Sequence, residues 1–149
     1  MCPVPRSPAL ALALGRSPVL AALRYVVAVR VRLSRDSVTA GDDVDGHDEV
    51  IDVDAVRPLS QVVAEVLGRR YLPSIQGGMA TWVLRSGRRG PALGIVAEQW
   101  TAPELLTDGT VAISAVGSEL HFEYRAQIDP RTVADSLSSH TDFPDRHVL

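Results

Sequence analysis

The sequence predicts a single small α+β domain in which a mixed or antiparallel sheet packs on one main helix. The chain has 149 residues, enough for one hydrophobic core, and its 46% apolar and 22% charged residues are typical of globular proteins. Several short segments alternate apolar and polar residues, as strands do, whereas one segment has the 3.6-residue period of a helix.

The first segment, residues 1–23, is predicted to lie outside the domain. It is rich in proline, and its apolar run is interrupted at Gly15 and Arg16. It has no convincing cleavage site, and no run of about twenty residues in this part of the chain lacks an arginine, which disfavours a signal peptide and a membrane span. We interpret it as an unpacked leader or an over-extended gene start. The domain is placed at residues 24–137, and residues 138–149 are expected to form a frayed tail.

The first two strands are expected on either side of an acidic loop. From Tyr25 to Leu33, valines alternate with alanine and arginine, which is the pattern of a half-buried strand. Residues 50–55 alternate again, with Val50, Asp52 and Asp54 on one face. A polar, glycine-containing loop between two such segments predicts a long hairpin.

The main helix is predicted at residues 58–71. Its apolar residues recur at helical spacing, and they are Leu59, Val62, Val63, Val66 and Leu67. Pro58 suits the first turn, two arginines near the end favour the negative end of the helix dipole, and Pro73 stops the helix.

The second half is predicted to consist mainly of strands. Residues 80–85 and 91–100 would pair across a tight turn at 86–90, residues 101–109 would form a turn, and residues 110–117 and 119–128 are two further strand candidates. Pro130 opens a short helix. This order of elements, over residues 25–127, resembles the β-grasp or ubiquitin-like superfold.

Composition restricts the function. All fifteen basic residues are arginine, and lysine and asparagine are absent, which indicates a high-GC bacterial genome. A Schiff-base lysine and a lysine-bearing phosphate loop are therefore excluded. One cysteine, Cys2, makes no internal disulfide and fits a reducing cytoplasm. A net charge of −3 gives no general attraction to nucleic acid or membranes.

The segment 70–90 contains most of the residues that we consider for a binding surface. Arg85, Arg88 and Arg89 form a basic turn that could contact phosphates, with a tryptophan to stack a base. The acidic hairpin argues against nucleic acid, because binding to its backbone needs a broad positive surface. The alternative is a ligand-binding or enzymatic site whose walls would be Tyr71, Trp82, Glu98 and Trp100.

Other candidate chemistry finds little support in the sequence. The acidic loop at residues 42–49 could gather around a cation, but it fails the EF-hand pattern at both ends, so a solvated loop is favoured. Ser118 lacks the flanking glycines of a nucleophile elbow, and the four histidines have no zinc-ligand spacing. Glu98, Glu119 and Glu123 could meet across strands as an acid/base pair, but outward-facing polar positions explain them better. The glycines at 77–78 follow a helix, whereas phosphate loops precede one.

These observations favour a small cytoplasmic, non-catalytic module that binds another protein through a sheet face or edge. No cofactor, metal, nucleic acid or membrane is predicted as a partner. The alternative of a ligand-binding domain or enzyme near Tyr71, Trp82 and Trp100 stays open, and a deep pocket beside those aromatics would favour it.

Overall fold

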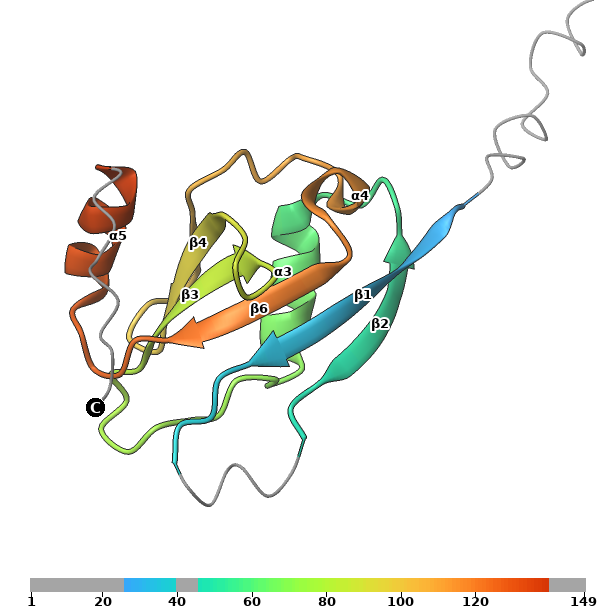
Figure 1. Ribbon diagram of the computed structural model, residues 1–149. Helices are drawn as coiled ribbons and strands as arrows, with labels where there is room; N and C mark the ends of the chain where they lie inside the picture. Colours follow the sequence, from blue (N-terminus) through green and yellow to red (C-terminus); the bar gives the residue numbers. More distant parts are fainter. Residues whose placement is uncertain (1–25, 40–45, 140–149) are drawn as a thin grey trace, which may run out of the picture.

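The computed structural model describes residues 26–39 and 46–139. These residues form an α+β domain with one six-stranded mixed sheet, in the order β2-β1-β6-β3-β4-β5, and three helices (Figure 1). In chain order the elements are β1 (Ala28–Arg35), β2 (Glu49–Asp54), α3 (Leu59–Gly68), β3 (Thr81–Ser86), β4 (Ala92–Ala97), β5 (Glu104–Leu105), α4 (Ile113–Val116), β6 (Glu119–Tyr124) and α5 (Pro130–Ser138). The predicted leader and almost all of the predicted tail lie outside the described residues. None of the helices described is long and apolar enough to cross a membrane.

The hairpin of β1 and β2 has the predicted alternation. Val31 and Leu33 are buried, and they are paired across the ladder with Ile51 and Glu49. The intervening residues of β2 lie on the opposite face, where Val50 is 60% exposed. The period-2 pattern therefore predicted both strands, although β1 begins three residues later and ends two residues later than the predicted segment Tyr25–Leu33.

The main helix is shorter than predicted. Helix α3 ends at Gly68, with Arg69 as its C-cap, and Arg70 has a positive φ of 57°. The predicted range of 58–71 is therefore three residues too long at its C-terminal end, because a left-handed residue cannot continue a right-handed helix. The apolar face is as predicted, and Leu59, Val62, Val63 and Val66 are all buried.

The segment 110–117 does not form the predicted strand. Its residues 113–116 form the short helix α4, and only an isolated bridge joins Ala112 to Pro58. Its backbone bonds the segment that leads into α3: Ile113 N–H donates to Arg57 O at 2.9 Å, and Leu59 N–H donates to Val111 O at 2.8 Å. The local pattern did not predict this conformation, because the segment bonds to residues distant in the sequence and buries Ile113.

The strand β5 was also missed. It lies within residues 101–109, which were predicted to form a turn, and it adds only two residues to the edge of β4. Strands that short carry no alternation that a sequence could reveal.

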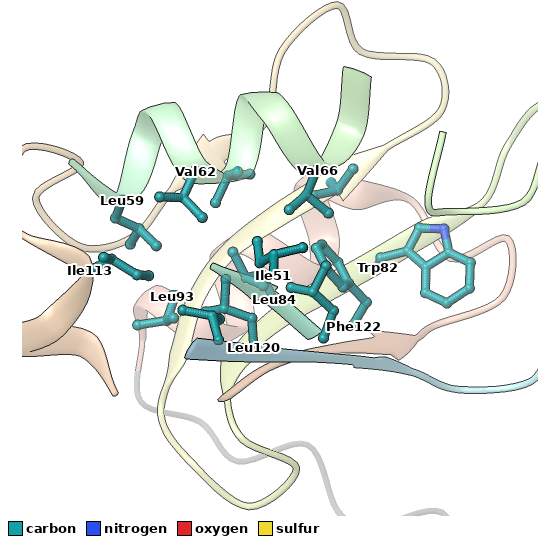
Figure 2. Close-up of a cluster of buried hydrophobic side chains, with 14 of the residues drawn as sticks. Ile51, Leu59, Val62, Val66, Trp82, Leu84, Leu93, Ile113, Leu120 and Phe122 are labelled. Carbon is teal, nitrogen blue, oxygen red and sulfur yellow. The ribbon is translucent and has the colours of Figure 1, made fainter. Parts of the chain in front are cut away.

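One helix packs on each face of the sheet. The larger core lies between the sheet and α3, and Figure 2 shows Leu59, Val62 and Val66 of the helix above Ile51, Leu84, Leu120 and Phe122 of the strands. On the opposite face α5 covers only β3 and β4, where Val133 and Ala134 pack with Val83 and Ile95. Strands β1 and β2 therefore extend beyond the cover of α5 (Figure 1).

Candidate functional site

The predicted site residues do not form one site. Trp82, Glu98 and Trp100 line a common groove, whereas Arg85, Arg88 and Arg89 belong to the far end of β3 and its turn. Tyr71 packs on the larger core and bonds to the end of the hairpin loop. The stretch 70–90 is therefore divided between two parts of the domain.

The groove lies between the end of α3, the loop after it and the segment that follows β4. It has a volume of about 240 Å³, and its walls are Leu67, Leu72, Pro73, Ser74, Trp82, Val96, Ala97, Glu98, Trp100, Thr101, Ala102 and Pro103. Pockets for drug-sized ligands usually have about 300–1,000 Å³. This groove is small and partly open, and the neighbouring hollow of about 460 Å³ between Trp100 and Arg131 is more open still. Neither is the deep pocket that would favour a ligand-binding site.

Trp82 belongs mainly to the core. It is only 1% exposed, and its ring is 4.8 Å from that of Tyr124, measured between centroids. Its indole Nε1 is buried and has no hydrogen-bond partner among the described residues. The ring therefore contributes mainly to the packing of the core, and only part of it faces the groove.

Glu98 holds the loop that follows α3. One carboxylate oxygen accepts the N–H of Ile75 at 2.7 Å, and the other accepts the N–H of Ala80 at 3.1 Å. Both oxygens are engaged with backbone, so the residue anchors residues 75–80 to the end of β4.

Trp100 is partly exposed at the rim of the groove. The guanidinium carbon of Arg131 lies 4.8 Å from the centre of its ring, and Arg131 Nη1 is 3.0 Å from Glu104 Oε2. Trp100 also packs against the smaller core beneath α5. It therefore connects α5 to the segment that follows β4.

Tyr71 closes the core near the hairpin loop. Its ring lies 5.8 Å from that of Phe122, and its hydroxyl donates a hydrogen bond to the carbonyl of His47. Burial raises the pKa of Tyr71 to about 12. A phenol held neutral in this way fixes the loop end and is a poor acid catalyst near neutral pH.

The arginine turn is also engaged in structural contacts. Arg85 pairs with Glu123 and donates to the carbonyl of Gly90 at 3.2 Å, and Arg125 pairs with the same glutamate at 2.7 Å. Arg88 and Arg89 are exposed, with Arg88 Nη1 4.0 Å from Asp36 Oδ1. Of the three candidates for an acid/base pair, Glu98, Glu119 and Glu123, the first is engaged with backbone amides and the last with two arginines.

The sequence did not reveal a polar chain that joins the buried Ser34 and His121 to the partly exposed Asp36. Ser34 Oγ is 2.8 Å from His121 Nδ1, and His121 Nε2 is 3.1 Å from Asp36 Oδ1. These residue types form the triad of serine hydrolases, but here the serine is 2% exposed and the histidine 3% exposed. Because no substrate can reach the hydroxyl, the chain is a structural link between β1 and β6.

Asp36 is held in its ionised form. Burial opposes its ionisation. Hydrogen bonds from His121 and from the N–H of Tyr124 favour the carboxylate, and so do the charges of His121 and Arg88. Together these interactions outweigh burial and lower the pKa of Asp36. The carboxylate thus fixes the chain beyond β1 against β6.

We expect Asp36→Asn to reduce stability at pH 7 and to have a smaller effect in acid. A lowered folded-state pKa stabilises the protein above the unfolded pKa of about 3.9, and this contribution is lost as the pH falls through the folded pKa. Urea melts of both proteins at pH 7 and about pH 3 would measure this. A difference that stays constant between the two pH values would show that the charge is unimportant.

The acidic loop is only partly described. Its residues 42–45 lie outside the described part of the chain, and Asp48 pairs with Arg32. The hydrogen bond from Arg32 lowers the pKa of Asp48. In residues 26–39 and 46–139, no group of three or more histidine, cysteine, aspartate or glutamate side chains is arranged to hold a metal ion.

Within the described part of the chain, no strand pairs with the backbone groups on the outer edge of β2. Ala55 N–H donates to Val27 O at 2.7 Å. Along an antiparallel ladder, every second residue bonds to the neighbouring strand, and the residues between point their backbone groups to the other side. Counting back from Ala55, the residues of β2 that bond to β1 are therefore Glu49, Ile51 and Val53. Val50 and Asp52 therefore direct both N–H and C=O away from the sheet. No described strand follows β2 in the sheet order.

The other edge of the sheet is much shorter. Strand β5 has two residues, and its Glu104 pairs with Arg131 of α5. Very short edge strands are one way in which proteins prevent pairing with other chains. Of the two described edges, β2 is the one that offers a continuous strand.

Comparison of the chain with models of known protein families, with curated proteins and with solved structures finds no match.

Proposed function

We propose that this protein is a non-catalytic, cytoplasmic bacterial module that binds another protein by adding a strand of its partner to β2. We also propose that its fold is of the β-grasp type. Two features support this: the order β2-β1-β6-β3-β4 and a central parallel pair, in which Leu33 is aligned with Leu120. Helix α3 covering one face adds to the resemblance. A fold of this type hosts many activities, so the binding function rests on the edge itself.

The unpaired outer edge of β2 is the observation that carries the proposal. Val50 and Asp52 offer two donors and two acceptors in the geometry of a sheet, and Asp54 adds its N–H, since its carbonyl accepts Arg57 N–H at 2.9 Å. Main-chain hydrogen bonds to such an edge supply affinity without any sequence motif.

A proline at Val50 tests the proposal without breaking the hairpin. The N–H of Val50 points outward, so Val50→Pro removes a donor from the edge and no bond from the ladder with β1. Val50→Ala shortens the same side chain but keeps the N–H, and it is the matched control. Both variants should unfold at nearly the temperature of the wild type.

The binding experiment uses seven-residue peptides selected from a random display library on the full chain. We expect selected peptides to slow amide exchange at Val50 and Asp52 and to bind Val50→Pro about tenfold or more weakly, since an added strand needs this donor. Binding to Val50→Ala should be close to wild type. Peptides that bind Val50→Pro as tightly as wild type, or a selection that returns no binder, would contradict the proposal.

A second candidate function is the binding of a small ligand in the groove beside Trp82 and Trp100. The partly exposed ring of Trp100 at the rim of the groove favours it, because binding sites for small ligands are commonly lined by aromatic side chains. Ala102 is exposed in the groove wall, so Ala102→Leu should fill the space without disturbing the core. Fragments that bind the wild type in ligand-observed NMR should no longer bind this variant. Fragments that still bind the variant would show that their site is not this groove.

A further inference from the structure

We infer that the strand added to β2 comes from a different protein and carries basic residues at alternate positions. This rests on the proposed binding at the β2 edge and concerns only the chemistry of the partner. The side chains that β2 presents on the face away from α3 are Val50, Asp52 and Asp54, so a partner strand would meet two carboxylates there.

The carboxylate of Asp52 is available to a partner. Arg30 Nε lies 3.4 Å from Asp52 Oδ1, and the side chain of Asp52 is 65% exposed and that of Arg30 83% exposed. Ion pairs this exposed contribute little, because water screens them. The other arginines near this edge are engaged, Arg32 with Asp48, Arg57 with Glu65 and Arg69 with Glu49. Cross-strand pairs of opposite charge stabilise a sheet, so arginine or lysine in the partner would add to its backbone bonds.

The same charges oppose pairing of β2 with a second copy of itself. The antiparallel register that aligns Val50, Asp52 and Asp54 with their counterparts places Asp52 opposite Asp52. A shift of two residues in one direction places Asp52 of each copy opposite Asp54 of the other. A shift in the other direction places Asp48 of each copy opposite Asp54 of the other. Like charges directly opposite each other destabilise a ladder, which is a common protection of exposed edges. The edge therefore disfavours its own copy and favours a basic strand.

Three synthetic peptides test this inference on the full chain. The first is Thr-Arg-Val-Arg-Val-Arg-Thr, and the others replace each arginine with glutamine or with glutamate. Fluorescence anisotropy of labelled peptides should show the order arginine, glutamine, glutamate, with the arginine peptide at least about fivefold tighter than the glutamine peptide. The difference in affinity between the arginine and glutamine peptides should shrink as the salt concentration is raised, because salt screens exposed charges.

Two variants of the ion pair give opposite expectations. Asp52→Asn removes the carboxylate and should weaken the arginine peptide by about two- to fivefold, with little change for the glutamine peptide. Arg30→Gln removes the competing cation and should strengthen the arginine peptide. If Asp52 and Arg30 had only a structural role, each substitution would change the affinities of the arginine and glutamine peptides by the same factor.

The outcomes separate this inference from the proposed function. If the glutamine or glutamate peptide binds as tightly as the arginine peptide and Val50→Pro still abolishes binding, the edge function stands and the basic partner is wrong. If the arginine peptide binds Val50→Pro as tightly as wild type, its contacts lie elsewhere and both are wrong. Sedimentation showing a dimer that Val50→Pro dissociates would identify a second copy as the partner and overturn the inference.

Discussion

Replacing Trp82 with alanine should lower the free energy of unfolding by about 3–5 kcal/mol, as truncation of a large buried aromatic does. Trp82 is 1% exposed and is among the largest fully buried side chains of the described chain. Its ring packs on Tyr124 of β6, and its strand pairs with both β4 and β6. Urea melts followed by circular dichroism would measure the loss.

The matched controls are the two arginines of the neighbouring turn. Arg88 and Arg89 are exposed, so Arg88→Ala and Arg89→Ala should change stability by no more than about 0.5 kcal/mol. This contrast tests whether the segment 70–90 is primarily scaffold. A Trp82→Ala protein as stable as the arginine variants would show that the indole serves binding and not packing.

The second large effect is expected from Glu98→Ala, which should cost about 2–3 kcal/mol. The substitution leaves the N–H groups of Ile75 and Ala80 without their charged acceptor, and hydrogen bonds to charged groups contribute more than neutral ones. The loss should be local at first, with faster amide exchange at these two residues than in β3.

Glu104→Ala is the control for Glu98→Ala. Glu104 pairs with Arg131, and the two side chains are 43% and 70% exposed, so its removal should have a small effect. If both variants lose the same stability, the backbone contacts of Glu98 are not what holds the loop.

Local patterns predicted much of the fold. Alternation predicted β1 and β2, and the spacing of Leu59, Val62, Val63 and Val66 predicted α3, because each pattern reports burial on one face. The predictions were wrong where backbone bonds to a distant segment accompany the conformation, as at Ile113, or where a left-handed residue such as Arg70 ends a helix. Neither signal extends over enough residues to form a period.

The candidate site was harder to predict because its parts come from distant segments. The link from Ser34 to His121 depends on the parallel register of β1 with β6, and the two residues are 87 positions apart. Glu98 was recognised as a candidate, but its backbone partners lie in a loop without periodicity. The sequence did show Val50, Asp52 and Asp54 on one face, yet which edge of which strand stays unpaired is a property of the whole sheet order.

The position of β6 has a consequence for how the chain is synthesised. This strand lies between β1 and β3, so the β1–β2 and β3–β4 hairpins share no ladder until it is inserted. A ribosome must therefore translate and release residues up to Tyr124 before the two halves can join. Until then β1 has an open inner edge beside its apolar face, and pairings between distant segments form slowly. The nascent protein is consequently most exposed to aggregation and to chaperones during translation of residues 55–124, when the first hairpin is complete but its central neighbour is missing.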